Sequence, residues 1–390
     1  MTSSLSIDRR FTIEDQMIAT KRHSTGFDYL RLILSILIIF FHTFIICYGR
    51  QTETLLWTGP LRSLWYFLVP GFFGMSGFLV ASSLMRVNNL VEFITLRGLR
   101  ILPALCGEVF ISAFLIGTFL TEAPLQEYFF NLTFFQYLLN AVGDIHYFLP
   151  GLFVHSAMGP LVNAQLWTIP YELECYGIIT IIGFVGLARY PRMLCLAVFL
   201  YTLFVHTIDW YSGRFVMEYR PPEHMTVSCC LWGIFIYIYR HKIPYNLYLL
   251  SGCVVVTWLA LMYADTVYIA SFPIAYITIY LGLMNPKKVF PVAYGDYSYG
   301  LYLYGFPIQQ AVYQVFPKYH IWYIHFPLSL FFASICAYVS WTYLEAKALG
   351  KKKVMLAKID ALCLRIKNSI STSSGMPIID NRAQHTTKTI

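Results

Sequence analysis

The sequence contains little charge for its length. Only 12% of its 390 residues are charged, whereas 57% are hydrophobic and the mean hydropathy is +0.58. A soluble domain needs far more polar surface than this, so the composition excludes a soluble globular protein and predicts an integral membrane protein. The lipid bilayer is therefore the first partner that the sequence implies.

Alternation of apolar and polar residues is also absent, which argues against a membrane β-barrel. The chain instead contains windows that are apolar almost throughout, such as 32–47, 247–262 and 328–339. Lipid offers no partners for backbone N–H and C=O groups, so these segments must be helices. We predict an all-α integral membrane protein, a bundle of about ten transmembrane helices at 27–48, 63–85, 101–121, 164–187, 192–209, 224–240, 246–263, 266–284, 297–316 and 321–346.

The sequence indicates neither a metal site nor a nucleic-acid partner. Its 9 cysteines are scattered, and only Cys229 and Cys230 are adjacent, without further Cys or His ligands nearby. The net charge of +8 follows membrane topology instead of marking a nucleic-acid surface. Of the 28 Lys and Arg residues, 22 fall on one side of the predicted spans and 5 on the other, which predicts that both termini are cytoplasmic.

The chain divides into three parts. Residues 1–24 are expected to form a cytoplasmic tail without fixed structure, and 25–346 the transmembrane domain. Residues 347–390 form a basic cytoplasmic tail, in which 354–367 has one apolar helical face and is expected to lie on the membrane surface. The longest outer loop, 122–163, is aromatic and apolar, so we expect it to pack back over the helices as a lid or re-entrant element.

Three ionisable residues within or at the ends of the predicted spans are candidates for function: Arg31, His42 and Glu172. A charged group placed centrally in a span costs about 2.5–3.5 kcal/mol on insertion scales, which makes such residues functional candidates. Arg31 and His42 lie on nearly the same face of the first span, roughly 16 Å apart along its axis. The alternatives are a packing histidine and an arginine that reaches the membrane surface.

Two further patterns suggest a polar ligand. Pro170 interrupts the fourth span shortly before Glu172 and frees backbone groups that need a polar cavity. Arg97 and Arg100 are neighbours on one helical face at the start of the third span, which suits a phosphate-bearing ligand. Taken alone, each pattern is also compatible with an ordinary helix end at the membrane surface.

Together these elements resemble the acyltransferase 3 family over roughly residues 24–346. Arg31, ten further residues and His42 are similar to the signature of the family's first span. Segment 72–79 (FFGMSGFL) is similar to the Ser-Gly-Phe element of its second span.

The remaining elements follow in the family's order. Arg97 and Arg100 resemble its paired arginines, and segment 166–176 (LWTIPYELECY) resembles its Trp and Glu element. Segment 295–303 (GDYSYGLYL) is similar to the Ser-Tyr and Tyr-Leu element of the ninth span. Gly305 departs from the pattern, because many members have a histidine two residues before the proline at this point. No role of a second histidine is therefore carried over.

The resemblance implies an O-acyltransferase. Its members move an acyl group, usually from cytoplasmic acetyl-CoA, to a hydroxyl of a lipopolysaccharide, an exopolysaccharide or another exported glycan or glycolipid. For this chain it implies acetyl-CoA as the donor, with succinyl or another short acyl group as an alternative. It also implies a multi-pass protein of the bacterial inner membrane.

The resemblance also assigns roles to residues. Arg31, Arg97 and Arg100 are expected to hold the phosphates of the donor. His42 is expected to act as a general base or as a transient acyl acceptor, and Glu172 to orient His42 or bind the acceptor.

Three further residues are expected to contact substrate: Ser76, Trp167 and Tyr171. A turn at Ser76 and Gly77 is expected to bring the backbone close to the acyl chain. A competing hypothesis is a transporter or exporter of a glycan or lipid-linked intermediate, since charged residues in broken spans also line substrate pathways. That hypothesis accounts for His42 and Glu172 but not for the arginine pair.

Overall fold

The computed structural model describes residues 11–22, 24–87, 90–213, 221–352, 354–359 and 361. Across these residues the regular elements are all helical, apart from one isolated bridge between Thr12 and Pro244. The expectation of an all-α fold is confirmed for this part of the chain.

The main helical segments are α2 (Gly26–Tyr48), α4 (Arg62–Leu84), α5 (Leu90–Phe110) continued by η1 (Ile111–Ile116) and α6 (Gly117–Leu120), η3 (Ala164–Thr168) with α9 (Ile169–Val185), α10 (Pro191–Tyr211), α12 (Glu223–Ile238), α13 (Leu247–Met262), η5 (Ala264–Ala270) with α14 (Ser271–Gly282), α15 (Ser298–Val315), and α16 (Trp322–Ser340) continued by η7 (Trp341–Glu345) and α17 (Ala346–Gly350). The shorter elements are α1 (Ile13–Ala19), α3 (Arg50–Thr58), α7 (Leu125–Phe130), α8 (Leu132–Leu138), η2 (Leu139–Val142), η4 (Leu187–Arg189) and η6 (Pro317–Tyr319).

Among the described residues, seven of these segments are long and apolar enough to cross a membrane: α2, α4, α5 to α6, η3 with α9, α10, η5 with α14, and α16 to α17. Two further expected spans coincide with α12 and α13, which are apolar but only 16 residues long. A helix of that length covers about 24 Å, less than the roughly 30 Å of a hydrocarbon core. The remaining expected span, 297–316, falls on α15. The structure supports a multi-pass membrane protein, while ten crossings and cytoplasmic termini stay predictions.

Helix α4 lies at the centre of the bundle, where small residues let its neighbours approach closely. A Cβ atom at Gly77 would lie 2.0 Å from the carbonyl oxygen of Cys230 on α12, and one at Gly233 would lie 2.2 Å from that of Gly74. The backbones of α4 and α12 therefore touch, as is common between membrane helices. Ser76 and Gly77 lie inside α4, so the expected turn at these residues is wrong.

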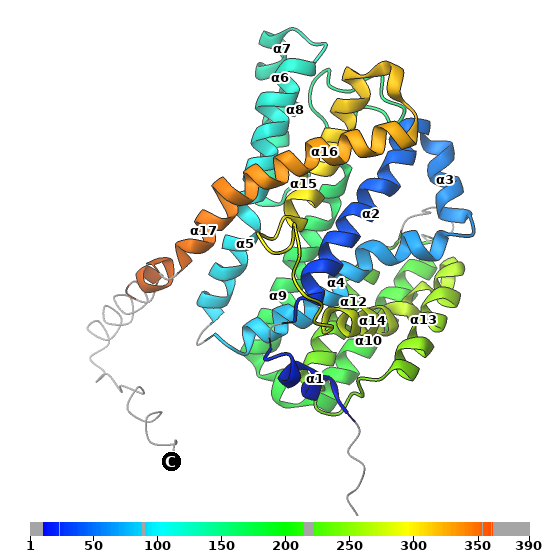
Figure 1. Ribbon diagram of the computed structural model, residues 1–390, viewed down its shortest axis with the longest axis vertical. Helices are drawn as coiled ribbons and strands as arrows, with labels where there is room; N and C mark the ends of the chain where they lie inside the picture. Colours follow the sequence, from blue (N-terminus) through cyan, green and yellow to red (C-terminus); the bar gives the residue numbers. More distant parts are fainter. Residues whose placement is uncertain are drawn as a thin grey trace, which may run out of the picture.

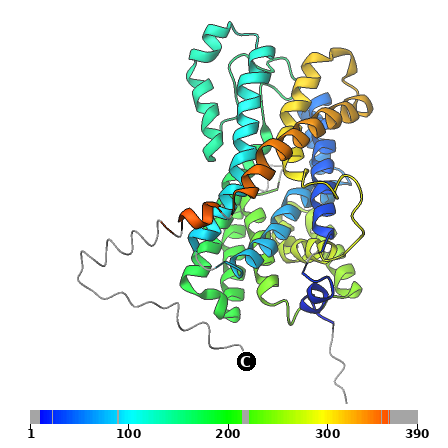
Figure 2. The same ribbon diagram turned by 60° about the vertical axis from the view of Figure 1, so that its left-hand side comes forward.

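The two longest helical segments are α5 to α6 and α16 to α17. The segment from α16 to α17 crosses the bundle diagonally and contacts α5, α15 and α2 along its length (Figure 1). At the other side, α7 and α8 stand beside the upper end of the α5 to α6 segment (Figure 2). Arg31 near the start of α2 and Arg100 on α5 both reach Asp296, which directly precedes α15, so they approach it from different helices.

The loop 122–163, which was expected on the outer side, contains α7, α8 and η2 and folds back onto α5. It forms a small apolar core with Val109 and Ala113 of the α5 and η1 segments, including Tyr128, Phe134, Tyr137, Leu149, Leu152, Phe153 and Val162. Ser156 in the same loop donates a hydrogen bond to Gln310 of α15 over 2.6 Å. The expected packing of this loop over the bundle agrees with these contacts.

The N-terminal segment is folded where the structure describes it, which differs from the expected tail without fixed structure. Helix α1 begins at a capping box formed by Thr12 and Asp15, and Ile13 is fully buried. The backbone N–H of Ile13 donates to Ile243, so α1 is fastened to the loop before α13. At the other end, residues 354–359 are helical, and the rest of the expected surface helix lies largely outside the described residues.

Candidate active site

All predicted site residues except Tyr171 line one of two neighbouring cavities. The arginine cavity is lined by residues that include Arg31, Phe72, Ser76, Arg97, Arg100, Glu172, Cys175, Tyr176, Cys230 and Tyr299. The histidine cavity is lined by residues that include Phe41, His42, Arg50, Glu53, Trp57, Trp65, Tyr147, Gln165, Trp167 and Phe306. Val69 and Tyr302 line both cavities, so they form the partition between them.

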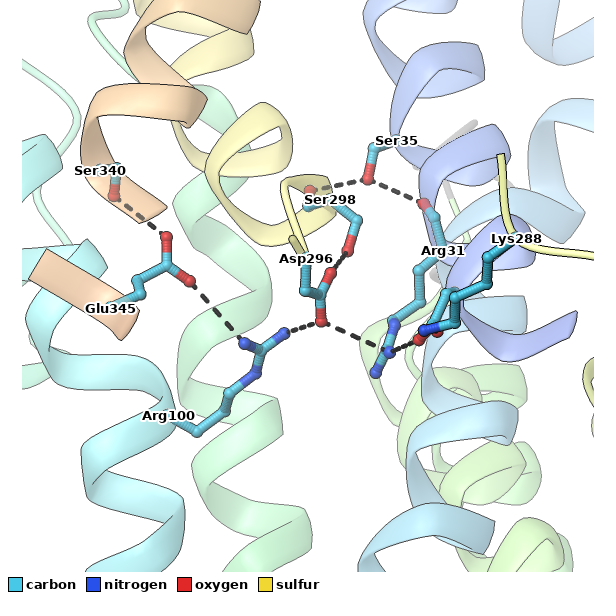
Figure 3. Close-up of polar contacts among 9 residues, drawn as sticks. Arg31, Ser35, Arg100, Lys288, Asp296, Ser298, Ser340 and Glu345 are labelled. Atoms are coloured by element: carbon cyan, nitrogen blue, oxygen red, sulfur yellow. Dashed lines mark hydrogen bonds and ion pairs between the residues drawn. The ribbon is translucent and has the colours of Figure 1, made fainter. Parts of the chain in front are cut away.

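An ion-pair network holds one wall of the arginine cavity (Figure 3). Arg100 on α5 contacts Asp296, just before α15, over 2.5 Å, and Arg31 on α2 contacts the same carboxylate oxygen over 3.4 Å. Arg31 also pairs with Asp28 over 2.7 Å, and Arg100 lies 3.8 Å from Glu345 of η7. Asp296 therefore links the start of α2 and the middle of α5 to the start of α15.

Asp296 stays ionised in this setting. Burial alone would raise the pKa of its carboxyl, but the charges of Arg31 and Arg100 and a hydrogen bond from Ser298 hold the pKa well below its usual range. Both arginines keep 22–25% of their side-chain surface exposed and line the cavity. They are thus fixed in place and still present N–H groups to an anionic ligand.

Arg97 differs from the other two arginines. It donates a hydrogen bond to Ser83 over 3.2 Å, and its Nε atom is buried without a hydrogen-bond partner in the described part of the chain. Its guanidinium lies 5.9 Å from the ring of Phe93 and forms no ion pair with the carboxylates that the structure describes. Arg97 is therefore the arginine with most of its bonding capacity left for a ligand.

Glu172 lies in the arginine cavity and not beside His42. The Pro170 that precedes it is accommodated in the first turn of α9, directly after the 3₁₀ helix η3. Its carboxylate accepts a hydrogen bond from Tyr176, one helical turn further on, over 2.6 Å. The structure thus groups Glu172 with Arg97 and Arg100, and the expected pairing of Glu172 with His42 is not observed.

His42 lies in the histidine cavity among aromatic rings. Its ring packs edge-to-face on Phe306 of α15, with 5.2 Å between centroids, and on Phe41 at 5.5 Å. Its Nδ1 atom is buried and has no hydrogen-bond partner among the residues described. An imidazole with a free nitrogen at a cavity wall can exchange a proton with a bound hydroxyl.

The three expected substrate contacts separate. Ser76 lines the arginine cavity and Trp167 the histidine cavity, whereas Tyr171 lines neither. The ring of Tyr171 packs between Trp167 and His224 of α12, at 6.1 and 5.8 Å. Tyr171 therefore packs against Trp167, and its contact with substrate stays a prediction.

Several polar residues at the site had no role predicted from the sequence. Asp296 is one of them, although an acid directly before a predicted span needs compensating charge. Glu108 is fully buried on α5 and accepts hydrogen bonds from Ser112 and Asn163 over 2.7 and 2.9 Å. It lies inside an expected span, where a charged group is costly, so the criterion used for His42 also makes it a functional candidate. Within the described chain, His, Cys, Asp and Glu form no group of three that could hold a metal.

Comparisons with known proteins identify the family of the chain. The family model described as an acyltransferase domain, acyltransferase 3, matches residues 24–345. The O-acetyl transferase of Shigella phage Sf6 is 25% identical over 358 residues, which cover 86% of this chain and 98% of that protein. Nodulation protein 10 of Rhizobium leguminosarum bv. viciae is 24% identical over 383 residues, covering 86% and 96%. No solved structure matches the chain.

The family match spans nearly the whole chain and includes both cavities. The protein therefore belongs to the acyltransferase 3 family, and it is a membrane acyltransferase. The resemblance drawn from Arg31, His42 and the paired arginines is confirmed at the level of the family.

Proposed function

We propose that the protein transfers an acetyl group from cytoplasmic acetyl-CoA to a hydroxyl of an exported polysaccharide or glycolipid. The observation that carries this proposal is the division of the site into a charged cavity and an aromatic cavity that share Val69 and Tyr302. Two substrates of different chemistry can then enter from opposite ends and meet at the partition. A relative named O-acetyl transferase supports the choice of acetyl.

The donor binds in the arginine cavity. Arg97, Arg31 and Arg100 present guanidinium groups that match the geometry of phosphates, and the cavity beyond them is lined by apolar residues such as Phe72 and Phe73. The phosphates stay at the arginines while the thin pantetheine arm extends toward Tyr302. In the topology predicted from the charge asymmetry, these arginines lie on the cytoplasmic side, where acyl-CoA is made.

The acceptor binds in the histidine cavity. Trp57, Trp65 and Trp167 offer flat faces for sugar rings, and Arg50 and Glu53 at α3 offer hydrogen bonds. His42 acts there as the general base, taking the proton of the acceptor hydroxyl as its oxygen attacks the thioester carbon. The bond to sulfur then breaks, and CoA leaves as its thiol.

The proposal is tested by acetyl transfer in inverted membrane vesicles, which expose the cytoplasmic side. Vesicles that contain the parent chain, His42→Ala or His155→Ala receive labelled acetyl-CoA, and label is measured in the glycan fraction at equal protein level. His155 is the matched control because its side chain is 84% exposed in the outer loop and lines neither cavity. We expect label with the parent and with His155→Ala, and a loss of at least about 100-fold with His42→Ala.

Two results would contradict this proposal. Equal labelling by His42→Ala would remove His42 from the reaction. No labelling by the parent with acetyl-CoA or succinyl-CoA, although the acceptor is present, would favour the competing hypothesis of a glycan or lipid-linked intermediate exporter. Exported acceptors of this kind also imply that the protein lies in a bacterial inner membrane. Separation of inner from outer membranes, followed by detection of the protein in each fraction, tests this localisation.

A further inference from the structure

Gln165 presents an unpaired amide to the histidine cavity. It lies on η3, lines the cavity together with His42, and is only 1% exposed. Neither Nε2 nor Oε1 of its side chain has a hydrogen-bond partner among the described residues. A buried amide that leaves both atoms unpaired destabilises a folded protein, so its presence calls for a ligand that completes its bonds.

The backbone around Gln165 is held firmly, so the free amide does not result from a loose segment. Its N–H donates to Asn163 over 3.2 Å, and its carbonyl oxygen accepts from Tyr302 over 3.0 Å. Asn163 is in turn fixed by the buried carboxylate of Glu108 over 2.9 Å. Three helices thus position Gln165, and none of these bonds uses its side chain.

The amide of Gln165 and the imidazole of His42 lie against consecutive residues of α15, Gly305 and Phe306. A Cβ atom at Gly305 would lie 3.3 Å from Nε2 of Gln165 and 2.8 Å from the side chain of Ile39, which is one helical turn before His42. The ring of His42 packs on Phe306, the next residue of α15. Gly305 therefore leaves space for the Gln165 amide, beside the residue of α15 that the His42 ring contacts.

We propose that Gln165 is a further catalytic residue, whose Nε2–H donates to the acyl carbonyl oxygen while that oxygen carries negative charge. This inference rests on the proposed function. As the acceptor oxygen bonds to the carbonyl carbon, the electron pair of the C=O bond moves to its oxygen, and His42 takes the hydroxyl proton. When the C=O bond re-forms, the C–S bond breaks and the thiolate takes that proton from His42. Removing one such donor lowers kcat by about 100- to 1,000-fold in enzymes that use one.

The test compares Gln165→Met with the parent in steady-state kinetics and thermal unfolding. Met matches the size of Gln and removes only the hydrogen-bonding atoms, so a purely structural side chain would tolerate it. We expect kcat to fall about 100- to 1,000-fold with the KM for acetyl-CoA unchanged and the Tm unchanged or higher. Gln165→Asn, which keeps the amide but draws it back by one methylene, should lose less activity.

Two further variants sharpen the test. Gln314→Met on α15 is the matched control: the Gln314 amide bonds the carbonyl of Leu120 over 2.8 Å and lines neither cavity, so kcat should stay within about twofold of the parent. Gly305→Ala adds a methyl group against the Gln165 amide and should lower kcat without removing any polar atom.

Three results would overturn the inference. An undiminished kcat in Gln165→Met, with the parent active, would remove Gln165 from the reaction and leave the proposed function intact. A raised KM for the acceptor alone would make it a binding residue, and a lower Tm would make it structural. Absence of transfer by the parent itself would overturn the proposed function as well, which separates the two failures.

Discussion

The two cavities satisfy their polar groups in opposite ways. In the arginine cavity, Arg31 and Arg100 are ion-paired to Asp296, and Glu172 accepts a bond from Tyr176. In the histidine cavity, buried polar atoms without partners in the described chain include Nδ1 of His42, both amide atoms of Gln165 and the indole nitrogens of Trp57 and Trp65.

The difference shows which parts of the site are built by the fold and which await a ligand. Arg31 and Arg100 are compensated by Asp296 before any substrate arrives, because an unpaired buried charge would destabilise the protein. Arg97 is the exception in this cavity, since it makes no ion pair with the described carboxylates. Neutral donors and acceptors are less costly to leave free. Mutations in the arginine cavity should therefore affect stability and donor binding, and those in the histidine cavity should affect turnover.

The largest effect on stability is expected from Asp296→Ala, which breaks the network at its shared carboxylate. The change leaves Arg31 and Arg100 without this partner, and losing one partner of a fully buried pair costs about 3–5 kcal/mol. Because these side chains are 20–25% exposed, we expect a loss of about 2–3 kcal/mol. Thermal unfolding of the detergent-purified variant measures it, and an unchanged Tm would contradict the structural role of Asp296.

The pH dependence of that difference is a control. The pKa of Asp296 is lower in the folded protein than in the unfolded chain, so its stabilising effect is fully present above the unfolded value of about 3.9 and is lost as the pH falls through the folded value. The gap in stability between the parent and Asp296→Ala should therefore be constant from pH 8 to pH 5. It should shrink only below about pH 4.

A smaller effect, on donor affinity, is expected from Arg97→Ala. Arg97 makes no ion pair with the described carboxylates, so its removal should cost little stability. A charge-assisted hydrogen bond to phosphate contributes about 1.5–3 kcal/mol, so the KM for acetyl-CoA should rise about 10- to 100-fold while kcat changes little. Glu92→Ala, near the start of the same helix, is the control. A fall in kcat with unchanged KM would place Arg97 outside the donor site.

The sequence was sufficient for the parts of the site that rest on helical spacing. Arg31 with His42 on one face of α2, and Arg97 with Arg100 on α5, follow from the 3.6-residue repeat and from the cost of charge in a membrane. The all-α fold follows from the apolar windows in the same way. These inferences need no knowledge of which helices are neighbours.

What the sequence could not provide is the pairing between helices. Glu172 was expected beside His42, but the structure places it in the first turn of α9, where it lines the arginine cavity. The role of Asp296 could not be predicted either, because it depends on α2 and α5 lying beside the start of α15. A turn was expected at Ser76 and Gly77 because glycine permits one, whereas in α4 this glycine serves close packing.

The smallest effect is expected from Lys288→Ala, which removes the most exposed member of the charged network. Lys288 contacts Asp28 over 2.9 Å, but its side chain is 46% exposed and Asp28 keeps its ion pair with Arg31. Exposed ion pairs contribute about 0.2–1 kcal/mol, and the remaining pair should keep the loss below about 0.5 kcal/mol. The loss should also disappear in high salt, because salt screens exposed charges far more than the Asp296 pairs. If Lys288→Ala destabilised the protein as much as Asp296→Ala, the exposed and buried ion pairs would contribute to stability together. Asp296 would then not be the residue on which the junction of the three helices depends.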